Sequence, residues 1–127
     1  MAAESILVVD DEAIIGTWFE REFSEKGYHV ESVLNGEAAV HAVQQSQYDL
    51  VFIDKNMPGM DGIETCREIK KLSPASICIF MTGKFDKDNT LQESEFLDAG
   101  GRTYYLYKPF GEGEIQDVIL KALGSGK

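Results

Sequence analysis

The sequence has no long apolar run, few basic residues and only two cysteines, and each shortage excludes a class of protein. No apolar run approaches the roughly 18 residues of a membrane span, and residues 1–5 are not a signal peptide, so we expect a cytoplasmic protein. Lysine and arginine together number 12 against 22 acidic residues, so a net charge of −10 should repel nucleic-acid phosphates. Cys66 and Cys78 lack metal-type spacing, which favours small buried side chains in a reducing compartment.

The length and composition are those of one globular domain. A chain of 127 residues can bury a core of its own, and 43% apolar with 27% charged residues is typical of folded proteins, not of disordered ones. The sequence contains no repeat, low-complexity segment or internal linker. We therefore expect a single domain over residues 1–127, with residues 124–127 as a flexible tail.

Short apolar runs alternate along the chain with segments of helical period. The apolar runs predict strands and the amphipathic segments predict helices. Five strands that alternate with five helices indicate an α/β fold with a doubly wound parallel sheet. The strands are expected at 5–9, 28–33, 49–53, 77–81 and 103–107, and the helices at 13–26, 37–45, 62–72, 90–98 and 112–123.

The first expected helix has a strongly apolar inner face. Its apolar residues recur with the 3.6-residue period of a helix, which places them against the sheet. Ile14 is also expected to reach the core side. The inner face is predicted to contain Ile15, Trp18, Phe19, Glu22 and Phe23.

Carboxylates follow two of the expected strands at the point where each strand ends. Asp54 follows the apolar run 50–53, and Asp10 and Asp11 follow the run 6–9. If the two strands are parallel neighbours, the three carboxylates meet at one rim of the sheet. Like charges at 4 Å repel by roughly 4 kcal/mol per pair at an effective dielectric of 20. The cluster therefore predicts a bound cation or raised pKa values.

Polar residues also end the fourth and fifth strands, and together with the acids they form a recognisable series. The motifs are Asp10-Asp11, Asp54 followed by Met57-Pro58-Gly59-Met60-Asp61-Gly62, Thr82-Gly83, and Lys108-Pro109-Phe110. In this order and at these spacings, over essentially the whole chain, they resemble the receiver domain of two-component response regulators. The resemblance implies a flavodoxin-like sheet of strand order 2-1-3-4-5, with the site at the switch point of the topology.

The resemblance also implies roles for these residues. Asp54 would be the nucleophile that accepts a phosphoryl group from a histidine kinase, with Mg²⁺ as cofactor. Asp11 and Asp54 would bind the metal directly, the backbone carbonyl of Asn56 would be a third ligand, and Asp10 would act mainly through water. The remaining phosphoryl contacts would come from Lys108, the Thr82 hydroxyl and the Gly83 N–H.

A receiver of this kind is a signalling switch and not a multiple-turnover enzyme, with slow self-dephosphorylation expected. Thr82 and Tyr105 are the expected switch residues, with Tyr104 as the alternative to Tyr105. The surface formed by the helix after strand four, strand five and the last helix would change on phosphorylation. The implied partners are a sensor histidine kinase or phosphotransfer protein and a downstream protein or output domain. Direct nucleic-acid and membrane contacts are not expected, and a homodimer formed on phosphorylation is compatible with this reading.

The chain departs from the family pattern in two places. The 26 residues from Thr82 to Lys108 exceed the spacing of compact members, and Gly100-Gly101-Arg102 replaces the usual Ala-Gly-Ala. These departures affect the expected signalling surface and not the phosphorylation site.

Several other functions remain open on the sequence. An aspartyl phosphohydrolase usually has a second Asp two residues after its nucleophile, where this chain has Asn56. A flavin-binding module would need Ser, Thr or Gly phosphate donors in the first loop, which is acidic here. A pseudo-receiver is disfavoured by the intact motif set. His29 and His41 have no acidic or metal-ligand companions in the sequence and are expected at the surface.

Overall fold

The computed structural model describes residues 4–54, 57, 59–83, 105–108 and 112–124, of which residues 82–83, 105–108, 112 and 122–124 are described by their backbone only. Five parallel strands form one sheet of order β2-β1-β3-β4-β5, as the sequence predicts. The strands are β1 (Ser5–Val9), β2 (His29–Val33), β3 (Leu50–Asp54), β4 (Ile77–Gly83) and β5 (Tyr105–Lys108), and the helices are α1 (Ala13–Ser24), α2 (Gly36–Gln45), α3 (Gly62–Leu72) and α5 (Glu112–Gly124).

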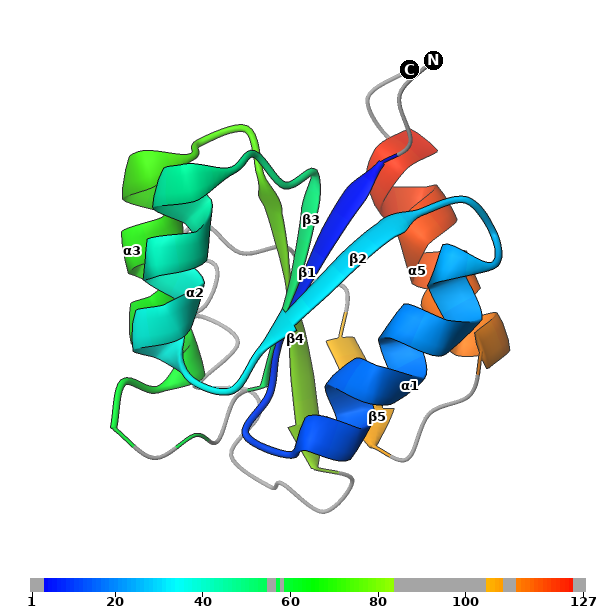
Figure 1. The fold of residues 1–127 in the computed structure, drawn as a ribbon, viewed down its shortest axis with the longest axis horizontal. Coiled ribbons are helices and arrows are strands. Elements are labelled where there is room, and N and C mark those ends of the chain that lie inside the picture. The colour runs from blue at the N-terminus through cyan, green and yellow to red at the C-terminus, as the bar shows by residue number, and fades with distance from the viewer. Residues whose placement is uncertain (1–3, 55–56, 58, 84–104, 109–111, 125–127) are drawn as a thin grey trace.

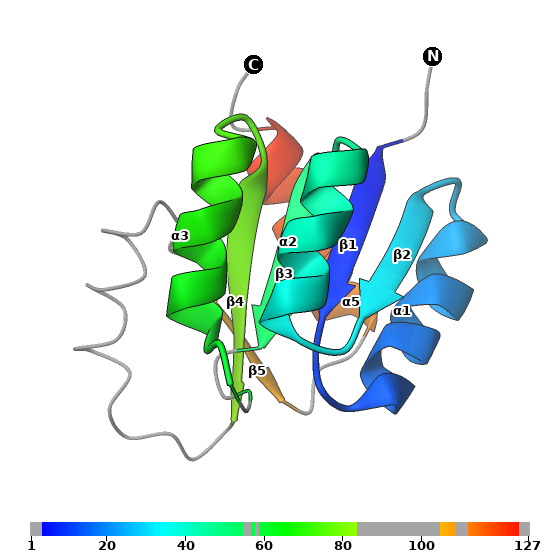
Figure 2. The ribbon, with the colours of Figure 1, turned by 60° about the vertical axis from the view of Figure 1, so that its left-hand side comes forward.

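Helices cover both faces of the sheet. Figure 1 shows α1 and α5 on one side of the strands and α2 and α3 on the other, and Figure 2 shows α2 and α3 side by side in front of the sheet. A parallel sheet needs this cover because both of its faces are apolar. The predicted doubly wound α/β fold is thereby confirmed. None of the helices in the described part of the chain is long and apolar enough to cross a bilayer.

The two central strands, β1 and β3, separate the core into two halves. Successive residues of a strand point to opposite faces, so alternate side chains of the same strand enter different clusters. Ile6 and Val8 of β1 pack with Phe19 and Phe23 of α1. Leu7 and Val9 pack instead with the residues of α2 and α3. Every one of these side chains is fully buried, and burial of each stabilises the fold by about 1.5–3 kcal/mol.

Most of the predicted boundaries agree with the structure to within two residues. Asp61 caps α3 as expected, since its carboxylate accepts the backbone N–H of Glu64 at 2.8 Å. Helix α5 extends to Gly124, so the first residue of the predicted flexible tail 124–127 is helical. The helix expected at 90–98 lies outside the described residues.

Ile14 contradicts the prediction for the inner face of α1. Its side chain is 73% exposed, whereas Phe19 and Phe23 are fully buried and Ile15 and Trp18 are half-buried. Ile14 precedes Ile15 by one position, which is a rotation of about 100° around a helix. When Ile15 faces the sheet, Ile14 must therefore turn away from it.

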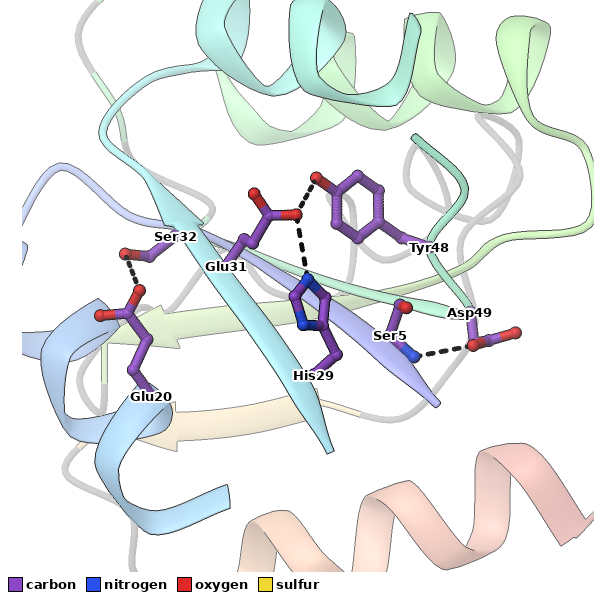
Figure 3. Close-up of polar contacts among 7 residues, drawn as sticks. All are labelled: Ser5, Glu20, His29, Glu31, Ser32, Tyr48 and Asp49. Carbon is purple, nitrogen blue, oxygen red and sulfur yellow. Dashed lines mark hydrogen bonds and ion pairs between the residues drawn. The ribbon is translucent and has the colours of Figure 1, made fainter. Parts of the chain in front are cut away.

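Polar side chains hold the edge strand β2 in place (Figure 3). The Tyr48 hydroxyl donates to Glu31 Oε1 at 2.7 Å, and His29 Nε2 lies 3.5 Å from the same oxygen. Burial, together with the hydrogen bond and negative charge of Glu31, raises the pKa of Tyr48 to about 12. The predicted surface position of His29 is correct, but the expectation that it lacks an acidic companion is wrong. Residues 29 and 31 are two positions apart in the strand, so their side chains point to the same face. The predicted strand was therefore sufficient to place Glu31 beside His29.

Candidate functional site

The carboxylates of Asp10, Asp11 and Asp54 converge at one rim of the sheet. Each can offer an oxygen such that the three atoms lie within 4.8 Å of one another. β1 pairs in parallel with β3, with Val9 opposite Ile53, so the residues that follow this pair emerge side by side. Among the described residues, these three form the one group of acidic, histidine or cysteine side chains arranged to hold a metal ion. The predicted convergence is therefore present in the fold.

The three carboxylates differ in their exposure to solvent. Asp10 and Asp54 are 2% and 5% exposed, and Asp11 is exposed at the mouth of the site. One oxygen of Asp10 accepts the backbone N–H of Glu12 at 2.9 Å, which orients this carboxylate at the start of α1. The backbone N–H of Asp10 also donates to Val33 of the edge strand at 3.2 Å. The deep acids are thus held by the sheet and the first turn of the loop, while Asp11 faces solvent.

A buried pair of like charges is unfavourable unless a cation compensates for it. Two ionised carboxylates at about 4.8 Å repel by roughly 3 kcal/mol at an effective dielectric of 20. An oxygen-only donor set with one solvent-exposed member matches the preference of Mg²⁺, which binds one or two carboxylates and keeps several waters. The donor set at this rim therefore fits a magnesium ion that Asp10, Asp11 and Asp54 could contact directly or through water.

The other predicted site residues are placed by the backbone alone. Thr82 and Gly83 end β4, and Lys108 ends β5, with Gly83 opposite Lys108 in the register. Because Asp54 pairs with Met81, the ends of β3, β4 and β5 share the rim that carries the acids. Asn56 lies outside the described residues.

Met57 and Gly59, two described residues between β3 and α3, lie close to the start of α2 and α3. Met57 is buried, and Gly59 has a φ of +77°, a conformation that glycine adopts without steric cost. A Cβ at Gly36 would clash with the Thr65 hydroxyl, so only a glycine permits this approach of α2 to the start of α3. The Thr65 hydroxyl itself donates to the Asp61 carbonyl at 2.7 Å. The starts of α2 and α3 are therefore packed closely against each other.

Two exposed apolar side chains lie next to the acidic rim, and the sequence prediction missed both. Ile14 is in the first turn of α1, and Leu34 follows β2 in the loop to α2; they are 73% and 52% exposed. The phase of the helix could have identified Ile14, as described above. Leu34 carries no comparable signal, because it lies in a loop without periodicity.

The chain is similar to proteins of two kinds that differ in length. It is 37% identical over 123 residues to sporulation initiation phosphotransferase F of Bacillus subtilis, a match that covers 97% of this chain and 96% of that protein. It is 40% identical over 121 residues to the uncharacterized transcriptional regulatory protein YrkP of the same organism, covering 95% of this chain and 50% of that protein. The chain thus spans about half the length of the latter relative.

A solved structure resembles the fold over nearly the whole chain. The receiver domain of sensor histidine kinase PA1611 from Pseudomonas aeruginosa PAO1 superposes with a TM-score of 0.80 at 29% identity, covering 97% of this chain and 99% of that one. That structure holds a magnesium ion coordinated in its active site cleft.

The match to a family agrees with the motifs, the sheet order and the acidic rim. The family model of the response regulator receiver domain matches residues 6–120, nearly the whole chain. Domains of this family act as signalling switches in two-component systems. With the strand order 2-1-3-4-5 and three carboxylates converging at its rim, this chain belongs to the response regulator receiver domain family.

Proposed function

We propose that this protein is a phosphoryl-accepting switch of a two-component phosphorelay, with Asp54 as the acceptor. The observation that carries the proposal is the convergence of Asp10, Asp11 and Asp54 within 4.8 Å, with Asp54 at the end of a fully buried strand. The phosphoryl donor is a phosphohistidine on a sensor kinase or phosphotransfer protein. A carboxylate oxygen of Asp54 forms the new P–O bond while the P–N bond to the donor histidine breaks.

The residues around Asp54 have separate tasks in this transfer. A bound Mg²⁺ supplies positive charge between the anionic nucleophile and the anionic phosphoryl group. Asp54, Asp11 and the Asn56 carbonyl would be its protein ligands, and Asp10 would act through water. Lys108, the Thr82 hydroxyl and the Gly83 N–H stabilise the phosphoryl oxygens, a role supported by the position of β4 and β5 at the same rim. Asn56 offers no general acid or base, so hydrolysis of the acyl phosphate should be slow.

Mg²⁺ should bind at the acidic rim and stabilise the folded chain. We expect Mg²⁺ to raise the thermal unfolding midpoint of the wild type, because an ion that binds only the folded state shifts unfolding by mass action. In Asp11→Asn the affinity measured by calorimetry should fall about 10-fold or more, since one ligand charge is lost. Asp117→Asn is the matched control, because it removes the same charge from an exposed ion pair with Lys121 on α5. Equal Mg²⁺ affinity in Asp11→Asn and in this control would refute the metal assignment.

Asp54 should be the sole phosphoacceptor. Incubation with Mg²⁺ and acetyl phosphate or phosphoramidate should add the mass of one phosphoryl group to the wild type, and none to Asp54→Asn, because an amide cannot form the acyl phosphate. Asp117→Asn should gain one phosphoryl group as the wild type does. A chelator of Mg²⁺ should abolish phosphorylation of both the wild type and Asp117→Asn. A stable phosphoryl mass on Asp54→Asn would place the acceptor elsewhere. Rapid repeated hydrolysis of a generic phosphate ester would indicate an enzyme instead of a switch.

The donor protein should approach over the start of α1. Ile14 and Leu34 expose apolar surface next to the acidic rim, and exposed apolar side chains near a reacting group are natural anchors for a partner. Ile14→Ser should reduce kcat/KM for transfer from a phosphorylated kinase by about fivefold or more, the effect of losing an anchor worth about 1 kcal/mol. Phosphorylation by acetyl phosphate should be unchanged.

A substitution at the end of the molecule away from the acidic rim controls for general effects of removing an exposed apolar side chain. Leu72 ends α3 and is 46% exposed, so Leu72→Ser makes the same chemical change far from the acids. This variant should retain the wild-type rate with the kinase. Equal rates for Ile14→Ser and the wild type would exclude α1 as the docking surface.

Phosphorylation should be read out through strand β5 and the last helix. Thr82 moves toward the new phosphoryl oxygens and Tyr105 occupies the space behind it, which alters the surface formed by residues 84–98, β5 and α5. A shift from 1:99 to 99:1 requires about 5.5 kcal/mol, within reach of a few charge-assisted hydrogen bonds of about 1.5–3 kcal/mol each. Amide exchange with and without beryllofluoride should change within residues 84–123. Changes confined to residues 12–46 would contradict this path.

A further inference from the structure

The two exposed apolar side chains beside the acidic rim lie at one end of the contact between α1 and β2. A Cβ atom at Gly16 of α1 would lie 2.5 Å from the Cβ of Ser32 of β2, so the two elements touch at these positions. Ile14 lies two residues before this contact and Leu34 two residues after it. Helix α1 begins and β2 ends at the same end of the sheet (Figure 2), so both exposed side chains lie on the rim side of the contact.

A backbone hydrogen bond joins this apolar pair to the rim. The N–H of Asp10 donates to the carbonyl of Val33 at 3.2 Å. The residues that follow these two, Asp11 and Leu34, therefore leave the sheet next to each other. An exposed carboxylate of the rim and an exposed apolar side chain are thus neighbours on one surface.

Further carboxylates border the apolar pair. Glu12 is exposed immediately before α1, and Glu37 is exposed in the first turn of α2. The Oε2 atom of Glu37 would lie 3.7 Å from a Cβ atom at Gly59, so this carboxylate reaches toward the segment that follows the acceptor strand. We call this surface the α1–α2 face, and it consists of Asp11, Glu12, Ile14, Leu34 and Glu37.

The segments that build the α1–α2 face contain no basic residue. Residues 1–20 and 27–54 have no lysine or arginine, and they have five and four acidic residues, respectively. These segments include β1, the first two turns of α1, β2, α2 and β3. The face therefore has a negative charge that its own segments do not neutralise, and it attracts a surface of the opposite charge.

We propose, on the basis of the function proposed above, that the α1–α2 face binds a basic protein surface in which lysine or arginine side chains surround an apolar contact. Ile14 and Leu34 anchor that contact, and the carboxylates speed association and orient the partner. A nucleic acid or an anionic lipid surface is repelled by the same charge. A small anionic phosphodonor is repelled as well and gains little from the apolar pair. The face therefore favours a basic donor protein over free anionic phosphodonors.

The first test is the binding of two synthetic helical peptides that differ only in charge. Both have leucines along one face, flanked by lysines in one peptide and by glutamates in the other. At low ionic strength the lysine peptide should bind and shift the amide resonances of residues 11–14 and 34–37, and the glutamate peptide should not bind. Roughly 1 M salt, which screens charges beyond about 3 Å, should weaken binding of the lysine peptide about 10-fold or more.

Substitutions separate this face from a general attraction to an acidic chain. Glu37→Lys should weaken binding of the lysine peptide about fivefold or more, and Glu37→Gln should weaken it less, because the first reverses the charge and the second only removes it. Ile14→Ser should weaken binding by a similar factor through the lost apolar contact. The matched control is Glu25→Lys, because Glu25 is exposed at the opposite end of α1. Its affinity should stay within about twofold of the wild type. Circular dichroism verifies that each variant is folded.

The second test is the rate at which acetyl phosphate phosphorylates the chain in the presence of Mg²⁺. At low ionic strength Glu37→Lys should raise this rate about twofold or more, since the anionic donor then meets less repulsion at the rim. Glu25→Lys should react at nearly the wild-type rate. Roughly 1 M salt should remove the difference between Glu37→Lys and the wild type.

The outcomes distinguish the docking face from the phosphorylation reaction itself. Equal affinity of the lysine peptide for Glu37→Lys and Glu25→Lys, resonance shifts confined to other surfaces, or equal binding of both peptides would overturn the inference. An unchanged or lower acetyl phosphate rate in Glu37→Lys would also overturn it. Phosphorylation of Asp54 without any such dependence on charge would refute the docking face alone. Absence of phosphorylation in the wild type would refute the proposed function instead, whatever the peptides bind.

Discussion

The parallel pairing of β1 with β3 is the constraint on which the site depends. The register places Val9 opposite Ile53, so Asp10 and Asp54 leave the sheet side by side, although 43 residues lie between them in the sequence. An antiparallel pairing would send the two strand ends to opposite edges and disperse the acids. A slip of the register by one residue would exchange the core faces of β1. The geometry of the carboxylates is therefore a direct consequence of apolar packing.

Packing of the apolar core offsets the energetic cost of the acidic site. Placing two carboxylates at nearly full burial within reach of each other is unfavourable, and no stability argument would select it. The apolar side chains of β1 and β3 are fully buried on both faces of the sheet, so their packing offsets that electrostatic cost. A cation bound at the rim, as proposed above, would relieve the remaining repulsion. The polar contacts of Glu31 with Tyr48, and of Asp49 with the N–H of Ser5, hold the opposite end of the sheet.

The sequence analysis erred where the environment of a side chain depends on residues that are distant from it or on another face of its element. The apolar character of Ile14 suggested burial, but its exposure is decided by which residues of α1 meet the sheet. Cys66 and Cys78 were each predicted to be buried, and each is; their membership of one apolar cluster depends on how α3 packs on the sheet. The companion of His29 was missed because the strand, and not the neighbouring residue, brings Glu31 to the same face.

The sequence by itself determined the α/β class, the cap at Asp61 and the identity of the three acids, because each depends on local periodicity or on a short pattern. The strand order was implied by the resemblance of its motifs to receiver domains. Only the tertiary structure decided the separation of those carboxylates, the burial of Asp10 and Asp54 against the exposure of Asp11, and the surface position of Ile14. Distances between side chains on different elements depend on register and helix orientation. The packing of the whole core sets both, and no local stretch of sequence contains them.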